Sequence, residues 1–181
     1  MTFEVDRAFA GRRVLVTGGA GFVGGSLVRR LVEQGARVTV LDDLFTGRAD
    51  TLPSSVQFVE GSVTDAPLVR KLVADSSVVF HMAARNIIAS TKNPRDDFET
   101  NIGGTLNVLL AARDSRPDRV VYTSSASVYG NPRSIPINED DPLVLLSPPS
   151  LLTAYGESRT SGSSSLIGIE RGFPYTDADD V

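Results

Sequence analysis

The chain has 181 residues, of which 41% are hydrophobic and 22% charged, and its formal net charge is -4. This length suits one domain with a sizeable core, and the acidic balance argues against nucleic acid as the main ligand. With no cysteine and a single histidine, His81, disulfides and a His-based metal cluster are excluded. No apolar run has transmembrane length and the first residues lack a signal-peptide core, so we expect a cytoplasmic domain.

Apolar runs alternate with helical patterns along most of the chain. Short apolar runs predict buried strands at 13–17, 37–41, 56–59, 77–81 and 119–123. Apolar periodicity and cap signals predict helices over 22–34, 65–74 and from 94 to about 113. Gly35 follows the first helix, where a left-handed residue is favoured. Strands joined by helical crossovers predict an α/β fold, a Rossmann-type doubly wound parallel sheet covered on both faces.

The pattern weakens after Tyr129. Five prolines between 130 and 152 predict a loop, and the chain from residue 160 is rich in glycine and serine and then acidic. We therefore place the folded domain at residues 1–159 and an atypical tail at 160–181.

Three glycines, Gly18, Gly21 and Gly24, stand directly after the first strand and open the first helix. Such glycines allow a tight turn, a close approach of pyrophosphate and close helix packing, and a helix N-terminus favours phosphate. Asp42 ends the second strand, at the distance where an acid takes the ribose hydroxyls. The alternative is a glycine-rich turn without a ligand, but strand, glycines, helix, strand and acid occur in the expected order.

The acid also bears on which dinucleotide is bound. A carboxylate at Asp42 would repel a ribose 2′-phosphate, and Arg48 lies beyond a probable turn, so the sequence favours NAD over NADP. Asp43 is the next residue. It is a candidate for cofactor binding, although a solvated neighbour of Asp42 is the simpler interpretation.

Between about residues 12 and 141 the chain resembles the extended short-chain dehydrogenase/reductases, specifically the NAD-dependent sugar-nucleotide epimerase/dehydratase group. The motifs that carry the resemblance are TGGAGFVG at 17–24, VLDDLFTGR at 40–48, GSVTD at 61–65, VFHMAA at 79–84, NIGGTLNVL at 101–109 and YTSSASVYG at 122–130. It implies a cofactor site formed by Gly18, Gly21, Phe22, Val23, Gly24, Asp42, Asp43, Val63, Asp65, Met82, Ala83, Ala84 and Asn101.

Several of these positions have specific roles in that family. The resemblance places Val63 and Asp65 against the adenine, and Met82, Ala83 and Ala84 under the cofactor. It implies that Asn101 holds the helix that backs the active site. Simpler interpretations stand beside these: Asp65 is also a good N-cap, and His81 at a buried strand end is more simply a packed residue than a base.

The family's chemistry uses a serine together with a Tyr-x-x-x-Lys pair. The tyrosine and the lysine of this pair lie on one face of a helix. The resemblance makes Ser125 the catalytic serine, with Ser124 as second choice, and Tyr155 with Arg159 the best match to the pair. The spacing and the charge are kept, but arginine is a planar fork and not a point charge. The alternative is that Tyr155 is an ordinary surface tyrosine. Tyr129 belongs to the structural VYG turn.

Two functions follow from the resemblance. The first is an NAD-dependent epimerase or dehydratase that acts on a nucleotide-sugar by Tyr- and Ser-assisted hydride transfer to bound NAD. The second is a truncated NAD-binding pseudoenzyme or regulatory module, because family members continue into a C-terminal substrate domain that this chain lacks and because arginine replaces lysine. A disrupted gene is a third interpretation. Since the family commonly dimerises through the helices around 94–113 and Tyr155, we expect a homodimer or association with a related chain.

Overall fold

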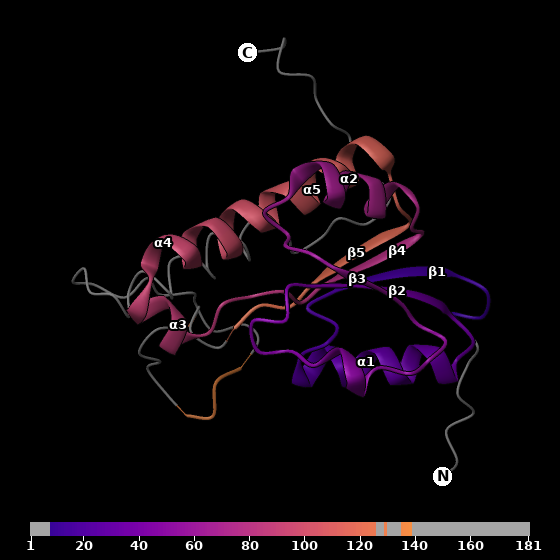
Figure 1. Cartoon of the computed structure of the whole chain (residues 1–181), viewed down its shortest axis with the longest axis horizontal. Helices are drawn as coiled ribbons and strands as arrows, with labels where there is room; N and C mark the ends of the chain where they lie inside the picture. The colour runs from indigo at the N-terminus through magenta and orange to yellow at the C-terminus, as the bar shows by residue number, and fades with distance from the viewer. Residues whose placement is uncertain (1–7, 126–128, 130–134, 139–181) are drawn as a thin grey trace.

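The computed structural model describes residues 8–125, 129 and 135–138. A single parallel sheet runs through this part of the chain in the strand order β3-β2-β1-β4-β5. Figure 1 shows α1 on one face of the sheet and α2 and α5 on the other. The predicted Rossmann-type doubly wound α/β fold is therefore confirmed. The predicted boundary at residue 159 lies outside the described residues.

The strands match the predicted apolar runs to within one residue at each end. They are β1 (Arg13–Thr17), β2 (Arg37–Asp42), β3 (Gln57–Glu60), β4 (Val78–His81) and β5 (Arg119–Tyr122). All neighbouring strands pair in parallel, with Thr17 opposite Leu41 on one side and opposite His81 on the other. The last residues of three strands, Thr17, Asp42 and His81, thus lie at the same edge of the sheet.

Alternation along β1 divides the core into two layers. Val14 and Val16 pack with Val28 and Leu31 of α1 (Phe22–Glu33), on one face. Leu15 packs on the opposite face, in the cluster that contains residues of α2 (Ala66–Ala74) and α5 (Thr105–Ser115). Successive strand residues point to opposite faces, so an apolar run without polar residues is what a sheet covered on both faces needs.

The C-terminus of α1 and the N-terminus of α2 lie where local sequence signals predict them. Gly35, directly after the C-cap of α1, has φ +81°, a left-handed conformation that glycine adopts without strain. Asp65 is the N-cap of α2, and its carboxylate accepts the N–H of Leu68 at 3.0 Å. The short 3-10 turn η1 (Ala49–Thr51) was not predicted. No helix of the described part is long and apolar enough to cross a membrane.

The prediction of one helix from 94 to about 113 was wrong in detail. The segment consists of α4 (Pro94–Asp97), a π-helical stretch η2 (Phe98–Gly104) and α5. A further helix, α3 (Ile87–Lys92), precedes it and was not predicted, because six residues are too few for a periodic pattern. Figure 1 shows α3 and α4 beyond one end of the strands. π-Helical turns inside helices often occur at functional sites.

Candidate functional site

A pocket lies at the carboxyl ends of β1 and β4. From β1 the chain continues to β2 on one side of the sheet, and from β4 it continues to β5 on the other side. In open α/β sheets, ligands bind at such a switch point, outside the carboxyl ends of the strands. The pocket has a cavity volume of about 90 Å³ and is open to solvent. It is lined by Gly18, Gly21, Leu41, Asp42, Asp43, Phe45, Thr46, Gly61, Val63, Met82, Ala83, Ala84, Arg85 and Thr100.

The glycine turn between β1 and α1 forms the floor of the pocket. Gly18 has φ +69°, and a Cβ there would lie 2.7 Å from the backbone nitrogen of Ala83. A Cβ on Gly24 would lie 2.1 Å from the carbonyl oxygen of Gly18. Both positions therefore require glycine for steric reasons. The turn also places the start of α1 beside the pocket, and Gly21, its N-cap, offers no side chain to the first N–H groups.

Asp42 joins the glycine turn to the loop after β2. Its side chain is buried, and its two oxygens accept N–H groups from Ala20 at 2.9 Å and from Leu44 at 2.8 Å. Each carboxylate oxygen can accept more than one hydrogen bond, so both retain capacity for a ligand. Asp42 thus shapes the pocket and presents negative charge on its wall.

Asp43 is not a solvated neighbour, as the simpler interpretation held. Its carboxylate accepts a hydrogen bond from Nη2 of Arg85 at 2.8 Å. The Arg85 Nε also donates to Asp96 at 2.6 Å, and its guanidinium lies over the Phe45 ring, 4.2 Å from the centroid. Burial by itself would lower the pKa of Arg85, but the hydrogen bonds to Asp96 and Asp43 outweigh it and raise that pKa, so the group stays charged.

Asn101 lies outside the pocket and acts on its wall. It is fully buried, its Oδ1 accepts the N–H of Arg85 at 2.8 Å, and its Nδ2 donates to the carbonyl oxygen of Arg85 at 3.3 Å. The same Nδ2 donates to the buried carboxylate of Asp97, which fixes the orientation of the amide. Asn101 therefore holds the pocket-lining loop after β4 rather than facing the pocket itself.

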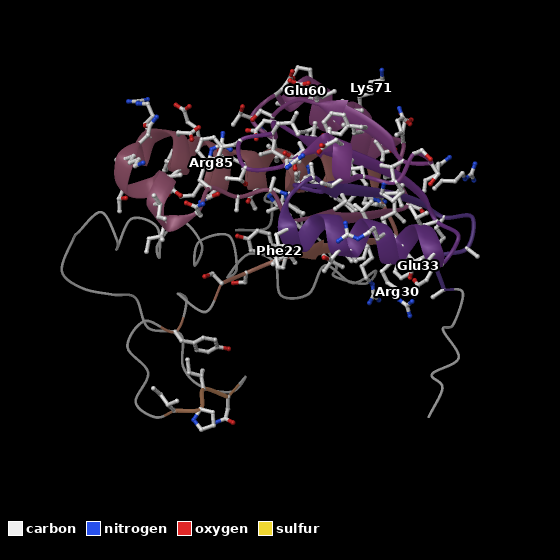
Figure 2. All side chains as sticks on the ribbon, turned by 60° about the horizontal axis from the view of Figure 1, so that its bottom comes forward. Phe22, Arg30, Glu33, Glu60, Lys71 and Arg85 are labelled. Carbon is white, nitrogen blue, oxygen red and sulfur yellow. The ribbon has the colours of Figure 1, made fainter. Side chains whose placement is uncertain are left out.

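Of the other predicted positions, Val63, Met82, Ala83 and Ala84 line the pocket with Gly18, Gly21, Asp42 and Asp43. The side chains of Phe22 and Val23 are 92% and 59% exposed and do not line it, and neither do Gly24 or Asp65. Figure 2 shows Phe22 at one end of α1 and Arg30 with Glu33 at the other. Ser125 follows the carboxyl end of β5. Tyr155 and Arg159 lie outside the described residues.

Sequence reasoning missed several pocket residues, above all Arg85 and Thr100. Thr100 belongs to η2 and is only 2% exposed, and its hydroxyl oxygen has no hydrogen-bond partner among the described residues. A buried hydroxyl without a partner is costly, so its presence on a pocket wall points to a ligand. No local motif predicts that either residue lines the pocket, because tertiary packing brings each of them there.

Comparison with known proteins agrees with this geometry. The profile of the "NAD dependent epimerase/dehydratase family" matches residues 14–174. The chain belongs to this family. Among its relatives, UDP-glucose 4-epimerase of Lactobacillus helveticus is 37% identical over 150 residues, covering 81% of this chain and 44% of that protein. A putative UDP-glucose 4-epimerase of Methanocaldococcus jannaschii is 38% identical over 160 residues, covering 87% and 52%.

Solved structures of epimerase/dehydratase proteins share the fold. The epimerase Mth375 of Methanothermobacter thermautotrophicus superposes with a TM-score of 0.80 at 35% identity, covering 88% of this chain and 47% of that one. The Bordetella bronchiseptica enzyme WbmG, solved with NAD, gives a TM-score of 0.74 at 34% identity, covering 90% and 51%. The chain thus spans about half the length of the relatives that it matches.

Proposed function

We propose that this chain binds NAD in the pocket at the β1–β4 switch point and supplies the cofactor half of a nucleotide-sugar epimerase. The observation that carries the proposal is the pocket itself. It places a glycine turn with no room for side chains, the start of α1 and the carboxylate of Asp42 around one space. The names of the relatives support a UDP-sugar as substrate.

The pocket fits a dinucleotide on three grounds. Glycine at positions 18 and 24 keeps the turn tightly packed, because a Cβ at either position would meet backbone atoms, and Gly18 and Gly21 line the pocket without side chains, so a phosphate can approach the backbone there. The start of α1 favours negative charge. The unpartnered hydroxyl of Thr100 offers one more hydrogen bond.

We propose that the dinucleotide is NAD and not NADP. Asp42 places a carboxylate on the pocket wall, which disfavours a 2′-phosphate. Arg48, the nearby cation, is held by Asp50 at 2.6 Å and does not line the pocket. The positive charge of Arg48, which a 2′-phosphate would need, is therefore paired with Asp50 outside the pocket.

In the proposed reaction, NAD supplies the hydride acceptor when bound. Tyr155 takes the proton of a sugar hydroxyl, Ser125 hydrogen-bonds the same oxygen, and the cation of Arg159 stabilises the tyrosinate. Arginine replaces the lysine of the family pair, so Arg159 is the position that decides turnover.

We also propose that the chain forms a homodimer through the helical face that contains Leu106.

Calorimetric titration with NAD and NADP tests the cofactor. We expect saturable binding of NAD, at least about tenfold weaker binding of NADP, and a loss of this preference in Asp42→Asn. Asp50→Asn, on the same loop but outside the pocket, is the matched control. A folded sample that binds neither dinucleotide would rule the proposal out.

Turnover is tested separately with a panel of UDP-sugars. We expect Arg159→Lys to raise the epimerisation rate if the rest of the site is intact. If the wild-type chain and this variant both bind NAD and neither turns over any sugar, the chain is a binding module and the enzymatic part of the proposal is wrong.

A further inference from the structure

The Arg85–Asp43 ion pair connects two strands that are not neighbours. Asp43 directly follows β2, Arg85 belongs to the loop after β4, and β1 lies between these strands. Adjacent strands lie about 4.8 Å apart, so the backbones of β2 and β4 are separated by roughly twice that distance, which the two side chains bridge. Both residues line the pocket together with Gly18 and Gly21 from the turn that follows β1. The pair therefore joins the two sides of the pocket across the end of β1.

Each end of this bridge is anchored. The Arg85 side chain is 11% exposed and is held by Asp96 and by the ring of Phe45, while its backbone is held by Asn101. Figure 2 places Arg85 beside the helices that follow β4. At the other end, the second oxygen of Asp43 accepts the N–H of Phe45 at 3.2 Å. Because both partners are largely withdrawn from water, the pair is screened less than one on the surface.

A second ion pair on the same loop differs in all of these respects. Arg48 and Asp50 are two residues apart in sequence, and their side chains are 73% and 64% exposed. This pair connects nothing across the pocket, and exposed pairs of this kind contribute little to stability. It provides a matched reference for the bridge.

We propose that the Arg85–Asp43 pair is a strap across the pocket, which must open before a dinucleotide enters or leaves. The inference rests on the proposed binding of NAD. A dinucleotide bound at a switch point lies across the crevice, from the side of β2 to the side of β4. It therefore has to pass the bridge that joins those two sides. A strap that closes equally well over the empty and the filled pocket slows both rates and leaves the affinity unchanged.

The test measures exchange rates of NADH by its own fluorescence after rapid mixing, with excess NAD as the competitor for release. We expect Arg85→Gln to raise the association and dissociation rates together by about three- to tenfold, so that Kd changes less than either rate. Asp43→Asn is expected to do the same, and the double variant no more than either. Arg48→Gln, which breaks the exposed pair, is expected to leave both rates unchanged.

Salt gives a second readout that needs no folding-sensitive variant. The dissociation rate of the wild-type chain should rise somewhat more steeply with ionic strength than that of Asp43→Asn, because only the wild-type chain has an intact strap for salt to weaken. Should the rates of both strap variants equal those of the wild-type chain, the strap is refuted. A rise in dissociation alone, with weaker binding, would refute it too, because Arg85 would then contact the ligand. A wild-type chain that binds no NADH overturns the proposed function itself.

Discussion

The hydroxyl of Thr17 lies 2.7 Å from Nδ1 of His81, and the two residues end neighbouring strands. The hydroxyl of Thr105 donates to the carbonyl of Asn101, so it must accept the proton on Nε2 of His81 at 2.9 Å. In the tautomer that carries its proton on Nε2, His81 accepts at Nδ1 from the hydroxyl of Thr17. The Thr17 oxygen in turn accepts the N–H groups of Met82 and Ala83. His81 is a packed residue that helps hold the pocket loop.

Thr17→Val should consequently destabilise the chain. The substitution keeps the shape of the side chain but leaves Nδ1 of His81 and the part-buried N–H of Ala83 without this partner, whereas the N–H of Met82 still donates to the backbone carbonyl of residue 17. We expect a loss of about 1–3 kcal/mol in the free energy of unfolding. Urea unfolding followed by circular dichroism measures it. Thr39→Val in β2 is the control, because Thr39 is half-buried and no described residue hydrogen-bonds its hydroxyl. Equal losses in the two variants would contradict the network.

Two adjacent glycines of α1 should respond in opposite ways to alanine. A Cβ on Gly24 would meet the carbonyl oxygen of Gly18 at 2.1 Å, and this backbone cannot move without disturbing the turn. A Cβ on Gly25 has its nearest neighbour at 3.5 Å, an ordinary contact. We expect Gly24→Ala to abolish NAD binding and Gly25→Ala to leave it unchanged.

Stability should separate the same pair of variants. Alanine is favoured over glycine inside a helix by about 0.5–1 kcal/mol, so Gly25→Ala should raise the free energy of unfolding by up to that amount. Gly24→Ala should lower it, because the steric conflict exceeds the gain in helix propensity. Thermal unfolding measures both. If Gly24→Ala bound NAD like the wild-type chain, the close packing of α1 on the turn would be irrelevant to the ligand.

Thr100 offers a test in which stability and affinity change in opposite directions. Thr100→Val removes a buried hydroxyl that has no partner among the described residues, so the ligand-free chain should be equally or more stable. The same change should weaken NAD binding by about tenfold if the hydroxyl bonds the ligand. Thr100→Ser keeps the hydroxyl and should retain the affinity. A Thr100→Val variant that is less stable and binds NAD normally would show a purely structural role.

The strands and the floor of the pocket were predictable because their causes are local. An apolar run such as 13–17 and the glycines that follow it carry their meaning within a few residues, and the order of motifs placed Asp42 beside Gly18. Arg85 and Thr100 were not predictable. Arg85 meets Asp43 because the sheet places the loops after β2 and β4 on either side of β1, and Thr100 lines the pocket from η2, a π-helical stretch. The spacing of residues in the sequence predicts neither of these two arrangements.

A stripe of apolar side chains on the helices after β4 bears on the proposed homodimer. Phe98, Leu106 and Leu110 are 59%, 52% and 41% exposed, and they stand at multiples of four residues along η2 and α5. Leu106 and Leu110 are four residues apart in α5 and therefore share a helix face, and Phe98 precedes them in η2. Exposed apolar surface of this kind is typical of protein–protein interfaces, and in the proposed homodimer a second copy of the chain would cover it.

Leu106→Glu should convert the proposed dimer into a monomer. The substitution places a charge in the middle of the apolar stripe, and pairing it with a second copy would bury two like charges without partners. Light scattering after size-exclusion chromatography measures the mass, and circular dichroism checks the fold. Arg70→Glu on α2 introduces the same carboxylate at an exposed position outside the stripe and should leave the mass unchanged. A wild-type chain that is monomeric at every concentration, or a Leu106→Glu variant that remains dimeric, would place the interface elsewhere or remove it.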